Sequence, residues 1–250
     1  MAIITTDIHG DPTVARLFLS FRPTELHICL GDVVDSRIHR PSFEKEAECL
    51  DLLLKSDSIL LWGNHDLAYL PERPWKCYGS FGEVAFQKQF DAARDRLLAA
   101  YSIDGWLCTH AGVSPKVGRF LVKEVGTTDQ ATVADWINTE FKRELQTRLP
   151  IHGPDELRYG HGPLFKIPVC RGGTDEYGGI FWFDAYGEQT QPSPAVGRQI
   201  FGHTPVPYPE RGTSAAFADG PPVSWINLNA IEGHWIYDTR HDEFIELIST

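Results

Sequence analysis

The sequence predicts an α/β fold, on three observations. Through the first 109 residues, short apolar runs alternate with segments of helical periodicity, which is typical of a largely parallel sheet with helices between its strands. From residue 180 onward, apolar runs follow one another without clear helical segments between them, which indicates a second sheet packed on the first. The chain has 250 residues, of which 42% are hydrophobic, enough for one domain with a sizeable core.

The first half contains four expected strands and three expected helices. The strands are the apolar runs at residues 2–6, 26–30, 58–62 and 105–109, and the helices are the segments at 12–20, 43–55 and 82–100. Ligands of α/β sheets collect at the carboxyl ends of the strands, so these ends are where a functional site is expected.

The second half begins with an amphipathic helix, expected at residues 131–149. The next segment, residues 150–179, holds four prolines and seven glycines, so we expect a long irregular insertion within a single domain that spans residues 1–250. Further strands are expected after this insertion, at 180–183, 199–201, 225–228, 235–237 and 244–247.

The charge and the cysteines restrict the partners and the compartment. The formal net charge is −11, and a sequence-independent grip on nucleic acid needs a basic face, so nucleic acid is a disfavoured partner. The five cysteines are odd in number and have no CxxC spacing, which argues against a disulfide framework. No stretch has the length of a membrane span or the character of a signal peptide. We therefore expect a cytoplasmic protein that does not contact the membrane.

Polar clusters follow five of the apolar runs. Each cluster contains Asp, Asn or His, usually beside glycine, which lets the backbone turn sharply or approach a ligand closely. Taken singly, each cluster has an ordinary explanation as a turn, a helix cap or a core histidine; together, at five strand ends, they favour a metal site. The clusters are Asp7-Ile8-His9-Gly10-Asp11, Gly31-Asp32-Val33-Val34-Asp35, Gly63-Asn64-His65-Asp66, His110-Ala111-Gly112 and Gly202-His203-Thr204.

Six side chains of these clusters are candidate metal ligands. Carboxylate, amide and imidazole ligands suit first-row divalent metals. If one carboxylate is shared, the six could hold two ions about 3.5–4 Å apart, the spacing of hydrolytic two-metal sites. Manganese is the first candidate, with iron, zinc, cobalt or nickel as alternatives. The six ligands are Asp7, His9, Asp32, Asn64, His110 and His203.

The five motifs, in this order, resemble the calcineurin-like metallophosphoesterases. The similarity is greatest to the phosphoprotein-phosphatase branch, which includes bacterial Ser/Thr phosphatases and symmetrical diadenosine tetraphosphatases. The motifs span residues 7–204. The resemblance implies an α/β/β/α sandwich of two mixed sheets with flanking helices. It also implies a first metal on Asp7 and His9, a second on Asn64, His110 and His203, and a bridging Asp32.

The chemistry expected of such a site is hydrolysis of a phosphate ester. Two cations lower the pKa of a bridging water enough to provide hydroxide. His65 follows the ligand Asn64, and neighbouring side chains on an extended backbone point apart, so His65 can face the leaving group and protonate it. Asp35 can accept a hydrogen bond from the imidazole and hold it oriented and charged.

The sequence defines the substrate less well. The protein-phosphatase branch keeps an arginine directly after its second motif, where this chain has Ser36 followed by Arg37. Arg37 therefore either grips the phosphate or is a solvated surface side chain. Arg171 and Arg198 are further candidates for substrate binding. The aromatic and basic loop at 67–78 includes Trp75, which could stack on a nucleobase or pack on the domain.

Three functions remain after these observations. The first is a metal-dependent phosphoric ester hydrolase that acts on a small phosphorylated or nucleotide-like molecule, with a Ser/Thr protein phosphatase acting on a phosphoprotein as its alternative. The second is a member of the fold that binds partners without catalysis; loss of His65 or of a ligand would signal it, and all these positions are intact. The third, a nuclease, is opposed by the charge of −11.

Overall fold

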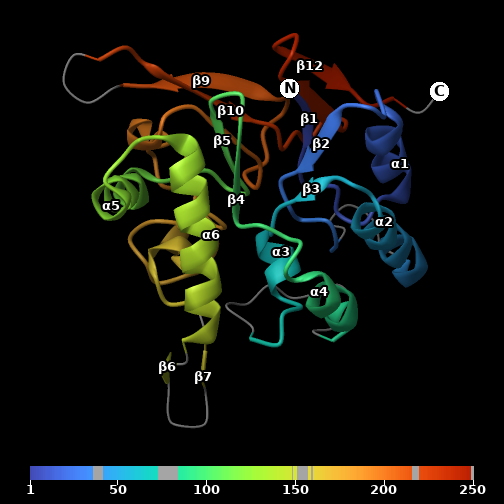
Figure 1. Ribbon diagram of the computed structural model, residues 1–250, viewed down its shortest axis with the longest axis horizontal. Helices are drawn as coiled ribbons and strands as arrows, with labels where there is room; N and C mark the ends of the chain where they lie inside the picture. The colour runs from blue at the N-terminus through green and yellow to red at the C-terminus, as the bar shows by residue number, and fades with distance from the viewer. Residues whose placement is uncertain are drawn as a thin grey trace.

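A computed structural model of the chain describes residues 1–35, 42–72, 84–147, 149–150, 157–158, 160–215 and 220–248. In this part of the chain, two mixed five-stranded sheets form a sandwich with helices on its outer sides (Figure 1). The α/β sandwich expected from the sequence is confirmed. Among the described residues, no helix combines the length and the apolar character that crossing a membrane requires.

The first sheet has the strand order β12-β11-β1-β2-β3. Strands β1 (Ala2–Thr5), β2 (Leu26–Cys29) and β3 (Ile59–Leu60) run parallel to one another. They are connected through α1 (Pro12–Ser20) and α2 (Phe43–Lys55), which pack against each other. Strands β11 (Trp235–Asp238) and β12 (Glu243–Glu246) complete the sheet as antiparallel neighbours.

The second sheet has the order β4-β5-β8-β10-β9. Its central strands, β5 (Trp106–Thr109), β8 (Gln199–Phe201) and β10 (Val223–Asn227), are parallel. Its edges are the antiparallel strands β4 (Ala100–Ile103) and β9 (Glu210–Ser214). Helices α5 (Pro115–Val125) and α6 (Gln130–Gln146) lie beside this sheet (Figure 1).

Alternate residues of the central strands pack into different layers. Ile4, Ile28 and Cys108 belong to one buried cluster, which collects side chains from both sheets. Their neighbours Ile3, Cys29 and Leu107 belong to a second cluster, which includes the side chains of the helices. These strands are therefore buried on both faces, which is why their sequences are continuously apolar.

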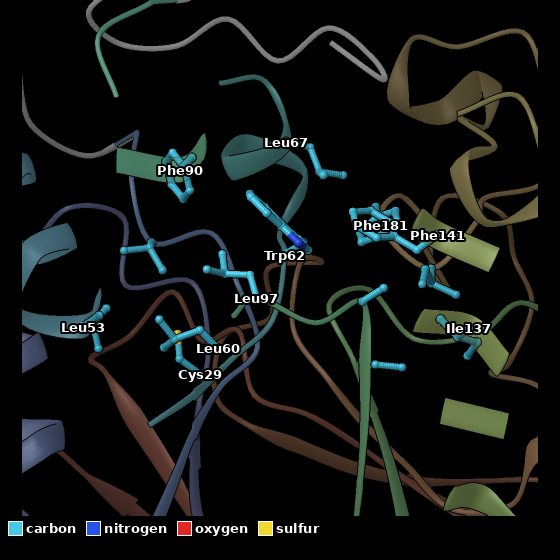
Figure 2. Close-up of a cluster of buried hydrophobic side chains, with 14 of the residues drawn as sticks. Cys29, Leu53, Leu60, Trp62, Leu67, Phe90, Leu97, Ile137, Phe141 and Phe181 are labelled. Atoms are coloured by element: carbon cyan, nitrogen blue, oxygen red, sulfur yellow. The ribbon is translucent and has the colours of Figure 1, made fainter. Parts of the chain in front are cut away.

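Trp62 lies between aromatic side chains of two helices, in the buried cluster that includes the side chains of the helices. Its ring centroid lies 5.6 Å from that of Phe90 on α4 (Gln87–Ala93) and 6.3 Å from that of Phe141 on α6. Figure 2 shows Trp62 with Phe90 on one side and Phe141 and Phe181 on the other. Because Trp62 directly precedes Gly63, this packing fixes the point from which the third polar cluster starts.

Two expected elements are wrong. Residues 82–100 were expected as one helix, but in the part that the structure describes they contain only α4 before β4 begins. Asp104 and Gly105 both have positive φ, 51° and 71°, and form the tight turn that pairs β4 with β5 as a hairpin. Residues 180–183 were expected as a strand, but they form a buried turn in which the N–H groups of Trp182 and Phe183 bind the Gly179 carbonyl.

The assignment of strands to sheets also differs from the expectation. The run at 105–109 was grouped with the first sheet and lies in the second, whereas the runs at 235–237 and 244–247 lie in the first. Pairing between strands decides this order, and apolar periodicity does not encode it. Helix α5 was not expected, although Pro115 in its first turn and the left-handed Gly126 at its end are ordinary helix signals.

The expected insertion at 150–179 is partly described. Its described part contains short elements, and Leu164 and Phe165 are buried in the main core, so that part packs as a portion of the fold. The division into a single domain stays a prediction. The short elements of this region and the next are β6 (Leu149–Pro150), β7 (Leu157–Arg158), η1 (Pro163–Phe165), η2 (Val169–Arg171) and η3 (Pro194–Val196).

Candidate metal centre

The five polar clusters meet at one end of the sandwich, beyond the carboxyl ends of β1, β2, β3, β5 and β8. Asp7, His9 and Asp32 offer ligand atoms that all lie within 4.8 Å of one another, and Asp32, His110 and His203 form a second such group. Asp32 belongs to both groups. The sixth candidate, Asn64, is beside them, because its Oδ1 lies 2.9 Å from His110 Nε2.

The backbone is strained at these clusters. Five residues have left-handed conformations, which cost a non-glycine residue about 1–2 kcal/mol each. Strain of this kind persists where surrounding contacts fix it, and it is concentrated at functional sites. The residues and their φ angles are Asp7 (51°), His9 (49°), Asp32 (53°), Asp35 (67°) and His203 (65°).

Two motif glycines make room for the carboxylates. A Cβ atom on Gly63 would lie 2.2 Å from Asp32 Oδ1, and one on Gly202 would lie 2.3 Å from Asp7 Oδ2. Any larger residue at either position would displace a candidate ligand. Gly63 and Gly202 are therefore required, because a neighbouring carboxylate approaches the backbone too closely for a side chain to fit.

Backbone carbonyl groups orient two of the histidines. Val34 O lies 3.1 Å from His9 Nδ1, and Leu30 O lies 2.9 Å from His110 Nδ1. A carbonyl accepts a hydrogen bond from Nδ1–H, which fixes the orientation of the ring and turns Nε2 to the opposite side. There, His9 Nε2 is 3.6 Å from Asp7 and His110 Nε2 is 3.5 Å from Asp32.

Asp32 lies at the centre of the arrangement and is fully buried. Its Oδ1 accepts the His65 backbone N–H at 2.9 Å. Its Oδ2 is buried and accepts no hydrogen bond from the residues that the structure describes; the imidazole nitrogens of His110 and His9 lie 3.5 and 4.0 Å away. Burying a carboxylate oxygen without a donor is costly, so this atom fits a bound cation.

The carboxylates and imidazoles of the site shift each other's protonation. Burial alone would raise the pKa of Asp32, but the charges of His110 and His65 outweigh it and hold that pKa well below its ordinary value. Burial alone would lower the pKa of His110, but Asp32 raises it to about 9. The same mixture of anionic and imidazole ligands stabilises divalent metals.

Asp66 braces the second and third clusters, a role that sequence reasoning missed. Its carboxylate accepts the backbone N–H groups of Asp32, Val33 and Gly63, each at 2.9 Å. Burial and the neighbouring Asp32 raise the pKa of Asp66 to about 6. The sequence did offer a signal, because Asp66 stands between the predicted ligand Asn64 and the apolar residues that follow it.

Asp7 is supported by two further residues that sequence reasoning missed. Its Oδ2 accepts the Thr6 hydroxyl at 2.5 Å and the His203 N–H at 3.0 Å. Its Oδ1 accepts the side-chain amide of Asn229 at 2.9 Å. Thr6 adjoins the first motif, but no local pattern marks Asn229.

His65 contacts Asp35 as expected, but the expectation of an extended backbone at Asn64 and His65 was wrong. His65 Nδ1 lies 3.0 Å from Asp35 Oδ2. Asn64 and His65 are not extended; they open the one-turn helix α3 (Asn64–Leu67). Successive side chains on a helix diverge by about 100°, so Asn64 still turns to His110 while His65 turns to Asp35. The His65 ring lies edge-on to that of His9, with 5.4 Å between centroids.

The candidate phosphate-binding arginines have different positions. Arg171 pairs with Asp184 (Nε to Oδ2, 2.7 Å) and donates to Thr204, directly after His203, at 3.2 Å. Arg198 lies at the opposite end of the strands, stacked on Trp106 with 4.5 Å from Cζ to the ring centroid, so its candidacy is wrong. Arg37, Ser36 and Trp75 lie outside the described residues.

A groove of about 750 Å³ lies at that opposite end of the sandwich. Trp106, Arg198, Arg211 and Tyr237 line it, and it contains none of the candidate metal ligands. Its arginines bind neighbouring groups, Arg198 the Gly105 carbonyl and Arg211 the Asp242 carboxylate. The groove is therefore separate from the metal centre.

The comparison with known families agrees with this geometry. A model of the calcineurin-like phosphoesterases matches residues 2–207, which include all five polar clusters. The chain belongs to this family. Asn229 and strands β9 to β12 lie beyond the matched residues.

Among solved structures, the chain is similar to a metallophosphoesterase from Sphaerobacter thermophilus. The match has 15% sequence identity and a TM-score of 0.47, and it covers 100% of this chain and 89% of the other. No curated protein matches the chain.

Proposed function

We propose that this chain hydrolyses phosphate esters at a centre of two divalent metal ions. The observation that carries the proposal is Asp32, whose buried Oδ2 accepts no hydrogen bond from the described residues and whose carboxylate belongs to both groups of potential ligands. Two separate groups of potential ligands that share one carboxylate favour two ions over one. Membership of the calcineurin-like phosphoesterases supports both the metal and the reaction class.

Each candidate ligand has a place in this proposal. Asp7 and His9 would hold the first ion, Asn64, His110 and His203 would hold the second, and Asp32 would contribute to both. Bound divalent ions would lower the pKa of a water and offset the charge of the phosphoryl oxygens. Manganese is the proposed metal, with iron, zinc, cobalt or nickel as alternatives.

His65 is the proposed general acid, and Asp35 is the group that orients it. With Nδ1 bonded to Asp35 (3.0 Å), a proton on Nε2 is directed away from that carboxylate and can be transferred to the leaving oxygen. His65 is 14% exposed whereas Asp35 is 2% exposed, so the imidazole is the member of the pair that a substrate can reach. The intact pair favours catalysis over a role limited to binding partners.

The proposed substrate is a small phosphorylated or nucleotide-like molecule. A net charge of −11 repels acidic phosphopeptides, and it matters less for a small ligand that reaches the metals directly. Arg171 is the proposed phosphate-binding residue, supported by its contact with Thr204 beside His203. A Ser/Thr protein phosphatase is the alternative within the same chemistry, and the cytoplasmic location belongs to the proposal as well.

The test combines metal content with a substrate panel. Metal-free protein is loaded with Mn²⁺ and analysed for ions per chain. It is then assayed with p-nitrophenyl phosphate, bis-p-nitrophenyl phosphate, a phosphoserine peptide and diadenosine tetraphosphate. We expect two ions per chain, hydrolysis that chelation abolishes and Mn²⁺ restores, and a higher kcat/KM for the nucleotide than for the peptide. At most one ion per chain, or hydrolysis of none of the four, contradicts the proposal; a tenfold preference for the peptide contradicts the substrate class alone.

A further inference from the structure

Asp35 is held on both oxygens, by His65 in α3 and by Tyr69 two residues beyond the end of that helix. His65 Nδ1 lies 3.0 Å from Oδ2, and the Tyr69 hydroxyl donates to Oδ1 at 2.6 Å. Tyr69 lies in the turn that follows α3, where its backbone N–H donates to the Asp66 carbonyl at 3.1 Å. The carboxylate cannot rotate without breaking one of these contacts.

The Tyr69 hydroxyl is itself fixed in place. Tyr69 is fully buried, and its ring packs edge-on to Phe86 (5.2 Å between centroids) and stacks with Phe90 (5.8 Å). Burial and the contact with Asp35 raise the pKa of Tyr69 far above its usual range, so the hydroxyl keeps its proton and acts as a donor. Aromatic packing in the core therefore determines where Asp35 Oδ1 lies.

The backbone of Asp35 is held from a third direction. Its N–H donates to Glu46 Oε2 on α2 at 2.8 Å, and Glu46 is fully buried. Asp35 has a left-handed φ of 67°, which needs such support because an L-residue is strained there. The backbone contact fixes where the residue is, and the Tyr69 contact fixes how its carboxylate is turned.

We propose that Tyr69 is a positioning residue for the acid step: by binding Asp35 Oδ1 it turns Oδ2 to His65 and so aims the imidazole at the leaving group. This inference rests on the proposed function, because it assumes that His65 protonates the leaving oxygen. Among the described residues, the hydrogen bonds and ring contacts of Tyr69 are with Asp35, Asp66, Phe86 and Phe90, none of which is a candidate metal ligand. Its effect therefore appears only where protonation of the leaving group limits the rate.

The experiment compares phenyl and p-nitrophenyl esters of whichever class, monoester or diester, the enzyme hydrolyses. Tyr69→Phe removes only the hydroxyl. We expect kcat for the phenyl ester to fall about 10- to 100-fold, at least about tenfold more than for the p-nitrophenyl ester, whose leaving group departs without a proton. Mn²⁺ stoichiometry and affinity should stay at the wild-type values.

A double-mutant cycle tests whether Tyr69 acts through His65. In a His65→Ala background, Tyr69→Phe should change neither ester, because the group that it positions is gone. Tyr237→Phe is the matched control: this buried hydroxyl donates to Asp242 at the far end of the sandwich, and its loss should leave both rates unchanged. Phe86→Leu, which loosens the Tyr69 ring and keeps the hydroxyl, should give a smaller loss with the same leaving-group dependence.

The outcomes separate the two proposals. Equal losses on both esters, no loss on the phenyl ester, or an effect that persists without His65 would overturn the role of Tyr69 and leave the phosphoesterase intact. If Tyr69→Phe fails to fold, an equal loss on both esters in folded Phe86→Leu overturns it in the same way. A wild-type protein that hydrolyses no ester would instead remove the proposed function itself.

Discussion

The side-chain amide of Asn229 donates a hydrogen bond to Asp7 Oδ1 at 2.9 Å, across 222 positions of sequence. Asp7 follows β1 in the first sheet and Asn229 follows β10 in the second, so this contact spans the sandwich. With Thr6 and the His203 N–H on the other oxygen, Asp7 is bonded at both oxygens and its orientation is fixed. A carboxylate held in this way is preorganised, as the proposed role of Asp7 in metal binding requires.

Asn229→Ala should weaken metal binding without removing a ligand. Loss of a hydrogen bond to a ligating carboxylate typically costs about 10–100-fold in metal affinity, and we expect this for the ion on Asp7, measured by Mn²⁺ titration calorimetry. Asn138→Ala is the control, because the Asn138 amide binds the backbone of Ala99 and Ala100, away from the site. Equal affinity in Asn229→Ala and Asn138→Ala would show that the contact does not orient Asp7.

Asp32→Asn should reduce metal content below two ions per chain. An amide cannot supply the negative charge shared between both groups of ligands, and its NH₂ end repels a cation. We expect kcat/KM to fall by more than about 100-fold, which exceeds the loss of about 10–100-fold that is typical when a residue supporting a metal ligand is removed. Elemental analysis and kcat/KM check the two effects. Asp242→Asn removes an exposed carboxylate at the far end of the sandwich and should change neither. Two ions retained in Asp32→Asn would make the bridging assignment wrong.

His65→Ala should slow hydrolysis while sparing the metals. Its imidazole contacts Asp35 and lies beside His9, and general acid help contributes typically about 10²–10⁴-fold. The loss in kcat should be larger for a poor leaving group such as an alkyl phosphate than for p-nitrophenolate. A loss of the same size on both substrates would exclude His65 as the acid.

The stability of the fold at low pH should depend on Asp238. This buried residue at the end of β11 contacts His241, the Arg240 N–H and Arg22. Burial alone would raise its pKa, but these contacts outweigh it and lower the pKa to about 2, below the value of about 3.9 in an unfolded chain. The carboxylate therefore contributes stability that is present above about pH 4 and is lost between about pH 4 and pH 2.

The measurement is urea unfolding at pH 6 and at pH 3. In the wild type, the Asp238 contribution of about 1–2 kcal/mol at pH 6 should decrease at pH 3. Asp238→Asn should lose that contribution at pH 6 and show a correspondingly smaller change on acidification. If the variant and the wild type lose the same free energy of unfolding between the two pH values, the contacts of Asp238 do not control acid stability.

The sequence by itself determined the class of fold and which residues meet at the candidate metal centre. Five clusters of polar residues follow apolar runs, and each run is local enough to be recognised as a strand, so their convergence could be argued from the geometry of a parallel sheet. His65 and Asp35 could be paired because His65 directly follows the predicted ligand Asn64 and Asp35 is three positions after Asp32. Their catalytic roles, and those of the metal ligands, stay predictions.

Only the tertiary structure decided how these residues are held. Asp66, Tyr69 and Asn229 contact residues 33, 34 and 222 positions away. Asp66 belongs to the third polar cluster, but the local sequence does not show which backbone groups its carboxylate binds, and the neighbourhoods of Tyr69 and Asn229 are those of an ordinary core Tyr and turn Asn. The strand order was undetermined for the same reason, because both faces of β1, β5 and β11 are apolar and fit either sheet. Local spacing specifies which chemical groups occur together along the chain, whereas long-range pairing and core packing specify which atoms of those groups meet.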